Sequence, residues 1–579
     1  MQNKLRFFND RIDVLCDKMD QETQQKVQQF YPVHFNRSRT LFTISIRKAP
    51  EVLAAFRGIT DDSILSAPQA IQHAYFSEIQ RRRVLDDLRT NGPKKSPVVN
   101  SKLTLQTHQQ LAREIAEVFN RFCFFYDTRT GKTLLSLSII NDDVQLNPRN
   151  KWLIICPLIL IENAWLQDAE YLPTLRVLNT HASTRDKRVS LINSANYSVY
   201  VTNTESFINY WEYFLQKGFT GCIIDESSDM KSHRSQVGKT IVEFSQQVPR
   251  MYLLSGTPAP NGEHEYYRQL QAVDFYGIQQ NPTQFKERYF YDKSRNPQFE
   301  KLVLMPHMKN ELQGILETYA IYVDKEDVIN TPGRSFEPVY FDLPEELMAR
   351  YKKLQYKMYV EIQEEKKQDT KKILASSIAA KLNKLNQLTS GFIIDTKAKK
   401  QNKQEGTNLQ ETYLFDMVRF SKMMDILQSF SNEQCIIWAN YHKEFDVIKE
   451  LLGKKCACVY GETSLEDKNK AIQDFKSGRV QYLVANPASA SKGLTLTNTC
   501  KAIYFSLTYS YELFKQSSER IYADKSIQPN FCKYYILIAN GTIDKDIYSN
   551  VLHNKADVSI TFLNHIRSCV GYNATDKDS

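Results

Sequence analysis

The sequence predicts an α/β protein with two successive parallel sheets, each flanked by helices. Three observations predict this fold class. From residue 100 onward, short apolar runs alternate with helical stretches; the alternation stops between about 340 and 430; and it then returns. Alternating strands and helices form right-handed βαβ units, and runs that are apolar on both faces suit the central strands of a parallel sheet.

The strand-like runs fall into two series. The first contains CFFYD, KWLIICP, SVYVTN, GCIIDE and MYLLSG, and the second contains QCIIWANY, CACVYG, VQYLVANP, KAIYFS and KYYILIA. Between them, the stretch from LPEELMARYKK to AAKLNKLNQL has the spacing of long amphipathic helices. The chain therefore reads as two α/β units joined by a helical insert.

A separate N-terminal domain precedes the first series. It reads as mostly helical with one strand-like run, LFTISI, and Gly92, Pro93 and Pro97 end it. The predicted organisation is an accessory domain at 1–98, a first α/β unit at 99–335, a helical insert or start of the second unit at 336–430, a second α/β unit at 431–560 and a tail at 561–579.

Composition limits the classes of protein. Hydrophobic residues make up 42% and aromatic residues 12%, which is typical of globular chains. The formal charge of +9 permits a nucleic-acid partner but does not require one. Cys456 and Cys458 have no second pair to complete a zinc site, and no run resembles a signal peptide or a membrane span. We expect a soluble intracellular protein without a membrane partner. Its expected location is the cytoplasm or, for a viral chain, the cytoplasm or nucleus of the host.

A nucleotide site is predicted by the stretch FCFFYDTRTGKTLLSLSII. A buried strand, a loop and a helix follow one another, which is the context that a phosphate-binding loop needs. Arg129, Thr130 and Gly131 form the end of the loop, Lys132 can reach the phosphates of ATP, and the Thr133 hydroxyl can ligate Mg²⁺. Tyr126 and Arg129 stand where glycine is usual, which weakens the pattern without abolishing it.

Two further strand ends carry polar residues. Asp225 follows GCII and suits Mg²⁺, which prefers a few carboxylates and water. Glu226 is placed to orient and deprotonate an attacking water. The run MYLLSGTP ends in Ser255, Gly256 and Thr257. Because ligands bind at the carboxyl edge of open parallel sheets, three such strand ends in order favour one ATP site over three unrelated turns.

These motifs resemble those of superfamily-two helicases, specifically the Swi/Snf-type double-stranded DNA translocases, across roughly residues 103 to 550. LQTHQQLAREIA resembles the leading segment, which implies that Gln109 reads adenine. LIICPLILIENAWLQDAEYL, VYVTNTESF, DESSDMKSHRS and LLSGTPAPNG resemble the motifs that follow, although Ser228 replaces the usual His or Asp. The family's fold implies two RecA-like lobes, with Ser255, Gly256 and Thr257 coupling hydrolysis to movement.

The second series carries the rest of the resemblance. YLVANPASASKGLTLTN contains the family's ASxGLxLT pattern, which implies a nucleotide contact for Gly493, and Gln516 and Arg520 match a Gln-x-x-x-Arg motif. The resemblance implies that Arg520 supplies a cation to the γ-phosphate. The family normally has a second arginine three residues later, where this chain has Ala523. Lys525 and Gln528 realign if two residues are inserted, but lysine lacks the planar guanidinium fork.

The resemblance also implies partners. Contacts with the backbone of double-stranded DNA are expected from Pro157, Asn203, Thr204, Ser489 and Lys492. RNA or branched DNA remain alternatives, and residues 1–98 are free to recognise a protein. Ala523 leaves three outcomes open: a slow ATPase, a cation from Arg520 or Lys525, or a helicase-fold scaffold that binds nucleic acid or protein without turnover.

Overall fold

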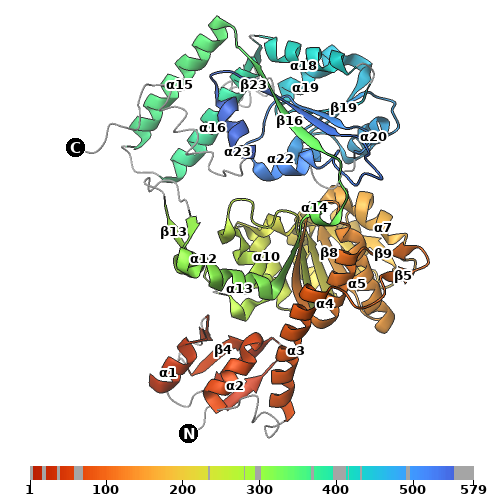
Figure 1. Ribbon diagram of the computed structural model, residues 1–579, viewed down its shortest axis with the longest axis vertical. Coiled ribbons are helices and arrows are strands. Elements are labelled where there is room, and N and C mark those ends of the chain that lie inside the picture. Colours follow the sequence, from red (N-terminus) through yellow and green to blue (C-terminus); the bar gives the residue numbers. More distant parts are fainter. Residues whose placement is uncertain are drawn as a thin grey trace. The chain divides into compact units, whose positions relative to one another are not determined.

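The chain forms two compact units (Figure 1). The computed structural model describes residues 4–8, 10–15, 21–30, 32–35, 40–57, 69–232, 235–278, 281–293, 302–366, 371–394, 412–414, 416–430, 433–490 and 496–552. The first unit comprises Met1–Asp292 and Leu302–Val328, and the second comprises Lys293–Lys301 and Ile329–Ser579. Each unit is built around one parallel sheet, as the sequence predicts.

The first unit contains lobe 1, a seven-stranded sheet in which every pair of neighbours is parallel. The strand order is β15 (Ala320–Val323), β7 (Arg121–Tyr126), β12 (Arg250–Leu254), β11 (Gly221–Asp225), β8 (Trp152–Cys156), β10 (Val199–Asn203) and β9 (Val177–Asn179). Along β7, Phe122, Phe124 and Tyr126 enter one hydrophobic core, and Cys123 and Phe125 enter another. Both faces of the sheet are therefore covered, which explains why its strands are apolar throughout.

Helices and short turns connect these strands. They are α4 (Thr107–Val118), α5 (Lys132–Leu146), α6 (Leu158–Leu160), η3 (Ile161–Leu166), α7 (Gln167–Ala169), α8 (Arg185–Asn193), α9 (Thr204–Gln216), η4 (Ser227–Met230), α10 (Gln236–Ser245), η5 (Glu263–Tyr266), α11 (Tyr267–Val273), η6 (Phe275–Gly277), α12 (Pro282–Tyr289), η7 (Pro306–Met308), α13 (Lys309–Tyr319) and α14 (Lys325–Val328). Two antiparallel pairs, β5 (Val98–Asn100) with β6 (Leu103–Thr104) and β13 (Phe290–Asp292) with β14 (Leu302–Leu304), lie beside them.

The N-terminal domain corrects one prediction. The run LFTISI does form a strand, β4 (Leu41–Ser45), and helices do make up most of the described residues of this domain, but LFTISI is not its only strand. β4 lies in a four-stranded antiparallel sheet with β1 (Lys4–Phe7), β2 (Arg11–Leu15) and β3 (His34–Phe35), packed with α1 (Gln21–Gln28), η1 (Ile46–Lys48) and α2 (Ala49–Arg57). The missed strands are short, and β1 and β2 mix charged with apolar residues, so the sequence gives them little periodic signal.

This domain packs against the amino edge of the lobe 1 sheet. Ser45 Oγ donates a hydrogen bond to Asp274 Oδ2 at 2.9 Å, and Tyr319 donates to the same carboxylate. The Arg47 guanidinium lies over the rings of Phe119 and Tyr319. β7 begins at this edge. The predicted ATP motifs follow the carboxyl ends of the strands, so they lie at the opposite edge of the sheet from the N-terminal domain.

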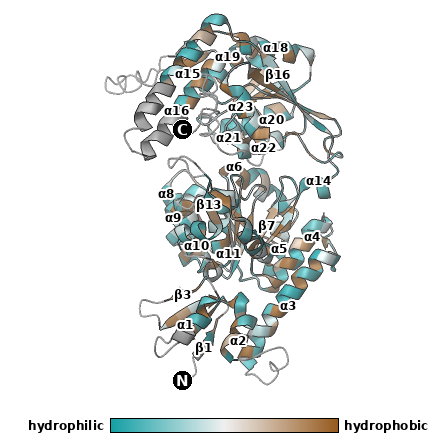
Figure 2. Cartoon of the chain, turned by 60° about the vertical axis from the view of Figure 1, so that its left-hand side comes forward, coloured by the Kyte–Doolittle hydropathy of each residue, from teal (hydrophilic) through white to brown (hydrophobic). Residues whose placement is uncertain are grey.

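The long helix α3 (Gln69–Asn91) leads from the N-terminal domain into lobe 1 (Figure 1). Hydrophilic and hydrophobic residues are mixed along its length (Figure 2). Three successive arginines, 81–83, lie near its middle. Arg82 forms ion pairs with Glu51 and Glu78, so that this arginine joins α2 to α3. Among the described helices, none has the length and apolar character needed to cross a membrane.

The second unit contains lobe 2, a six-stranded sheet that is also parallel throughout. The strand order is β16 (Arg334–Phe341), β23 (Cys532–Ala539), β22 (Lys501–Tyr504), β19 (Cys435–Trp438), β21 (Tyr482–Ala485) and β20 (Cys456–Val459). β16 spans the predicted start of the helical insert at 336 and pairs with β23 along its whole length. The first strand of this lobe therefore comes before the insert.

Helices of lobe 2 include the two long ones predicted between the series, α15 (Glu345–Lys366) and α16 (Lys371–Thr389). A short antiparallel pair, β17 (Phe392–Ile394) and β18 (Thr412–Leu414), follows α16. The remaining helices are α18 (Val418–Ser429), α19 (His442–Leu452), η8 (Gly453–Lys455), α20 (Leu465–Lys476), α21 (Pro487–Ala490), α22 (Tyr511–Ser518) and α23 (Ile543–Leu552). The predicted tail at 561–579 lies outside the described residues.

Candidate ATP site and nucleic-acid residues

The three predicted ATP motifs lie on neighbouring strands. β7, β12 and β11 are adjacent and parallel, so the phosphate-binding loop, Ser255–Thr257 and Asp225–Glu226 all follow strand ends at one edge of the lobe 1 sheet. With about 4.8 Å between strands, the ends of β7 and β11 lie roughly 10 Å apart. That separation leaves room for a phosphate chain and a hydrated cation.

The phosphate-binding loop connects β7 to α5, which begins at Lys132. Gly131 caps the helix in the left-handed conformation, with φ 77°. Lys132 Nζ donates hydrogen bonds to the carbonyl oxygens of Tyr126 and Asp127, at 2.9 and 3.0 Å. The ammonium group is thus held over the loop whose backbone would receive phosphate.

Tyr126, in a place usual for glycine, points away from the loop. Its buried hydroxyl donates a hydrogen bond to the His108 carbonyl oxygen at 2.7 Å, and His108 Nε2 lies 2.8 Å from the Thr130 carbonyl oxygen. Burial lowers the pKa of His108, which favours the neutral ring that donates through Nε2. Tyr126 thus joins the start of the loop to α4, and His108 of α4 contacts the end of the loop.

Gln109 lies directly against the loop. Its Nε2 donates to the Gly131 carbonyl oxygen at 3.0 Å, and its Oε1 accepts a hydrogen bond from the Gln106 backbone at 2.8 Å. A Cβ atom on Gly131 would lie 2.0 Å from Gln109 Nε2. The positive φ favours glycine at this position, and a Cβ there would displace the end of the Gln109 side chain from the Gly131 carbonyl oxygen.

Arg129 and Glu226 share a backbone conformation that L-residues rarely adopt. Their φ values are 64° and 57°, and among the described residues they are the non-glycine residues with positive φ. Such conformations cost free energy and gather at functional sites. The Arg129 position thus has the glycine-like backbone of the usual motif although its residue differs.

Asp225 and Glu226 end β11 in a buried turn, with exposed fractions of 8% and 7%. Asp225 Oδ1 accepts a hydrogen bond from the Glu226 backbone at 3.0 Å, and Oδ2 accepts one from Trp165 Nε1 at 3.2 Å. Among the described residues, no group of three or more His, Cys, Asp or Glu side chains could hold a metal ion. Mg²⁺ in nucleotide sites takes one or two carboxylates together with phosphate oxygens, so Asp225 with Thr133 is a fitting donor set.

Ser255, Gly256 and Thr257 connect these two motifs. Ser255 is buried, and its Oγ accepts a hydrogen bond from the Thr257 backbone at 3.1 Å. A Cβ on Gly256 would lie 3.3 Å from the backbone nitrogen of Thr128, so this segment lies against the phosphate-binding loop. On the other side, Gln269 joins Ser227 to the Pro258 carbonyl oxygen at 2.8 and 2.7 Å. Sequence reasoning missed Gln269, because nothing marks it within its helix.

The predicted nucleic-acid residues of lobe 1 lie farther along the same edge. Pro157 caps α6 after β8, and Asn203 ends β10, with Thr204 opening α9. His181 Nδ1 lies 3.2 Å from Asn203 Oδ1. Because β8 and β10 follow β11 in the strand order, the predicted nucleotide residues and the predicted nucleic-acid residues occupy two adjacent parts of one edge.

The predicted residues of lobe 2 are described in part. Ser489 lies in α21, half-buried, whereas Lys492 and Gly493 lie outside the described residues. Gln516 lies in α22, and Arg520 just after it donates from Nε to the Gln516 carbonyl oxygen at 2.7 Å. Both side chains are buried within the unit.

Ala523, Lys525 and Gln528 lie in the segment that follows Arg520. Ala523 is buried, and Lys525 is exposed. Gln528 Nε2 donates to the carbonyl oxygens of Thr497 and Thr499, at 3.1 and 2.7 Å. Gln528 is therefore part of the internal packing of lobe 2.

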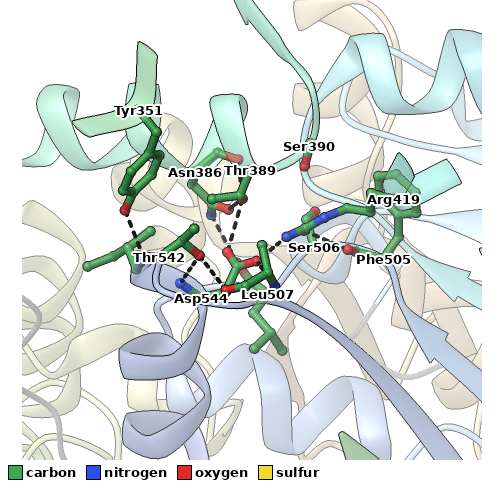
Figure 3. A network of polar contacts seen from close by, with 12 residues as sticks. Tyr351, Asn386, Thr389, Ser390, Arg419, Phe505, Ser506, Leu507, Thr542 and Asp544 are labelled. Carbon is green, nitrogen blue, oxygen red and sulfur yellow. Dashed lines mark hydrogen bonds and ion pairs between the residues drawn. The ribbon is translucent and has the colours of Figure 1, made fainter. Parts of the chain in front are cut away.

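A buried polar network that the sequence did not predict supports the loop before α22 (Figure 3). Arg419 forms an ion pair with Asp544 and donates to the Phe505 carbonyl oxygen at 2.8 Å. Thr389 Oγ1 donates to Asp544 Oδ1 at 3.0 Å, which brings in the end of α16. Glu444 accepts hydrogen bonds from Ser390 and Ser506, at 2.7 and 2.8 Å. A charged residue within a mostly apolar helix stripe, such as Arg419, is the only signal that could have pointed to it.

Comparison with known proteins finds two family models that match successive parts of the chain. The model of the SNF2-related domain matches residues 118–390, and the model of the helicase conserved C-terminal domain matches residues 418–523. Protein p41 of Acyrthosiphon pisum secondary endosymbiont phage 1 is 23% identical over 72% of this chain and 88% of its own. The SWI/SNF-related matrix-associated actin-dependent regulator of chromatin subfamily A-like protein 1 of Drosophila melanogaster is 24% identical over 62% of this chain.

This chain spans 43% of that fly protein's length. Among solved structures, the Sulfolobus solfataricus SWI2/SNF2 ATPase core in complex with dsDNA is 20% identical over 82% of this chain and 98% of its own, with a TM-score of 0.37. The two domain models together match more than half of the chain, in the order that the motifs predict. The chain therefore belongs to the Swi/Snf-type group of superfamily-two helicases and carries the two RecA-like lobes of their ATPase.

Proposed function

We propose that this protein hydrolyses ATP at the carboxyl edge of lobe 1 and uses the reaction to move along or remodel double-stranded DNA. One observation carries the proposal: Lys132, Thr133, Asp225 and Glu226 follow the ends of two strands that are separated only by β12. The group to which the chain belongs consists of ATP-hydrolysing proteins, and the side chains that the reaction needs are present together.

Each of these side chains has a distinct role in the proposal. Lys132 exchanges its contacts with the Tyr126 and Asp127 carbonyl oxygens for the β- and γ-phosphates. Thr133 and Asp225 would hold Mg²⁺, which neutralises charge on the phosphates when it is bound. Glu226 orients and deprotonates the attacking water.

For lobe 2 we propose Arg520 as the cation that stabilises charge on the γ-phosphate during hydrolysis, with Gln516 and Gly493 as further nucleotide residues. A guanidinium in this role contacts the γ-phosphate mainly in the transition state, so it raises kcat more than it lowers KM. Ala523 motivates the alternative of a scaffold that binds ATP without turning it over.

Double-stranded DNA is the proposed partner. The Drosophila relative is named for chromatin, and the net charge of +9 suits an anionic partner. Pro157, Asn203, Thr204, Ser489 and Lys492 are proposed to contact its backbone, which gives binding without sequence preference. RNA, branched DNA and a protein bound by residues 1–98 remain alternatives for the assay.

The test is ATP hydrolysis measured alone and with duplex DNA, single-stranded DNA or RNA. We expect stimulation mainly by duplex DNA. Glu226→Gln should lower kcat by about 10²–10⁴-fold while ATP still binds. Lys132→Ala should lose turnover and weaken ATP binding. Lys239→Ala, which removes an exposed lysine on α10 of the same lobe, is the matched control and should behave as wild type.

Three results would contradict the proposal. Unchanged hydrolysis in Lys132→Ala would place the activity elsewhere. Stimulation by RNA but not by duplex DNA would favour the RNA-directed alternative. ATP binding without turnover, unaffected by Glu226→Gln, would identify a scaffold.

A further inference from the structure

Trp165 is a fully buried tryptophan that contacts Asp225 at the carboxyl edge of the lobe 1 sheet. The two residues come from different elements, because Asp225 ends β11 whereas Trp165 follows β8. Trp165 lies in η3, a π-helical segment of the run that begins after Pro157 and ends with α7. π-helical turns are rare and occur frequently at functional sites. The role of this side chain is not accounted for by hydrolysis as described above.

The indole N–H of Trp165 holds one oxygen of the Asp225 carboxylate, with Nε1 to Oδ2 at 3.2 Å. The other oxygen, Oδ1, accepts from the Glu226 backbone at 3.0 Å. β11 pairs with β8 up to Ile224 and Ile155, so Asp225 lies beside the end of β8. The carboxylate is thus fixed by its own turn and by the helical run that follows β8.

Such a donor does more than fill space. Hydrogen bonds from outer groups orient a carboxylate ligand and favour its charged form, and their loss commonly weakens metal binding or activity by about 10–100-fold. We propose that Trp165 is a positioning residue that orients Asp225 for Mg²⁺. The inference rests on the proposed function, because it needs Asp225 to be a metal ligand.

Lobe 1 offers a matched control. Trp152 is also fully buried, and its Nε1 donates to Asp143 Oδ2 at 2.8 Å. Asp143 lies near the end of α5, and Trp152 opens β8 at the amino edge of the sheet, away from the ATP motifs. Replacing either tryptophan by phenylalanine removes one buried indole–carboxylate hydrogen bond from the same lobe.

The experiment measures binding of N-methylanthraniloyl-ADP to the full chain over a range of Mg²⁺ concentrations, without hydrolysis. In Trp165→Phe the Mg²⁺ concentration that gives half of the gain in nucleotide affinity should rise about tenfold or more. It should stay near the wild-type value in Trp152→Phe. Nucleotide affinity in EDTA should be the same in all three proteins.

The inference is overturned if the Mg²⁺ requirement rises equally in both variants, or in neither, while the wild type binds nucleotide with Mg²⁺ dependence. A wild type without Mg²⁺-dependent binding would instead overturn the proposed function, and this inference with it. If Trp165→Phe does not fold, 3-benzothienylalanine at position 165, which keeps the shape of the side chain but lacks the N–H, gives the same comparison against position 152.

Discussion

The polar residues at the carboxyl edges of the two lobe sheets differ in backbone conformation and in their partners. In lobe 1 this edge contains Arg129 and Glu226 in left-handed backbone conformations. In lobe 2 the corresponding edge contains the Arg419–Asp544 ion pair and the Glu444 carboxylate, which are buried among internal partners. Among the residues that the structure describes in lobe 2, no non-glycine residue has positive φ.

We interpret the strained residues of lobe 1 as features of a candidate ligand site, and the buried, paired charges of lobe 2 as features that stabilise the fold. Strain persists only where surrounding structure enforces it, and it is expected where a ligand gains from a fixed backbone. A buried, paired charge instead fixes the elements that carry it. We therefore expect changes at the lobe 1 edge to alter nucleotide binding, and changes in the lobe 2 network to alter stability.

The largest stability effect is expected in lobe 2. Arg419→Ala should lower the free energy of unfolding of this lobe by about 3–5 kcal/mol, because Asp544 stays buried without its cation. The control is Arg350→Ala, which breaks the exposed Glu346–Arg350 pair within α15 and should cost about 0.5 kcal/mol or less. Urea-induced unfolding, monitored by hydrogen exchange of the backbone amides in β22 and β23, measures the free energy of unfolding of both variants. Equal losses in the two variants would show that the network does not support lobe 2.

The sequence predicted both sheets because their strands are apolar on both faces, as in β7 and β19. It predicted that the three ATP motifs lie at one edge of the lobe 1 sheet, because the carboxyl ends of parallel strands lie on the same side of a sheet. It could not predict the hydrogen bond between Trp165 and Asp225, or the network of Arg419, Asp544 and Glu444. Those contacts join residues far apart in the chain, and no local period or spacing encodes such pairs.

Tyr126 shows the same limit from the other direction. Measured against a motif, it weakened the phosphate-binding loop, since glycine is usual there. In the folded chain its hydroxyl reaches the His108 carbonyl oxygen, so that the tyrosine braces the loop. A one-dimensional pattern registers the missing glycine but cannot register the contact that replaces it.

A smaller effect is expected at the glycine that the loop retains. Gly131→Ala should cost about 2–3 kcal/mol, from the left-handed backbone and from the lost hydrogen bond between Gln109 and the Gly131 carbonyl oxygen. Gly218→Ala is the control, because its φ is 66° and a Cβ there would meet nothing within 4 Å. The control should cost only about 1 kcal/mol.

Thermal unfolding and nucleotide affinity measure this pair. The affinity should fall in Gly131→Ala alone. If both variants lose the same stability and neither loses affinity, then the close approach of Gln109 has no role in shaping the loop.

The smallest effect tests strain at Arg129 directly. Arg129→Gly and Arg129→Ala remove the same guanidinium, but only alanine keeps a Cβ at φ 64°. The free energy of unfolding should therefore be about 1 kcal/mol higher for the glycine variant than for the alanine variant. Nucleotide affinity should change by the same factor in both, because the charge is lost in both. Equal stability would show that this backbone relaxes when the side chain is removed, and that the lobe 1 edge does not store strain there.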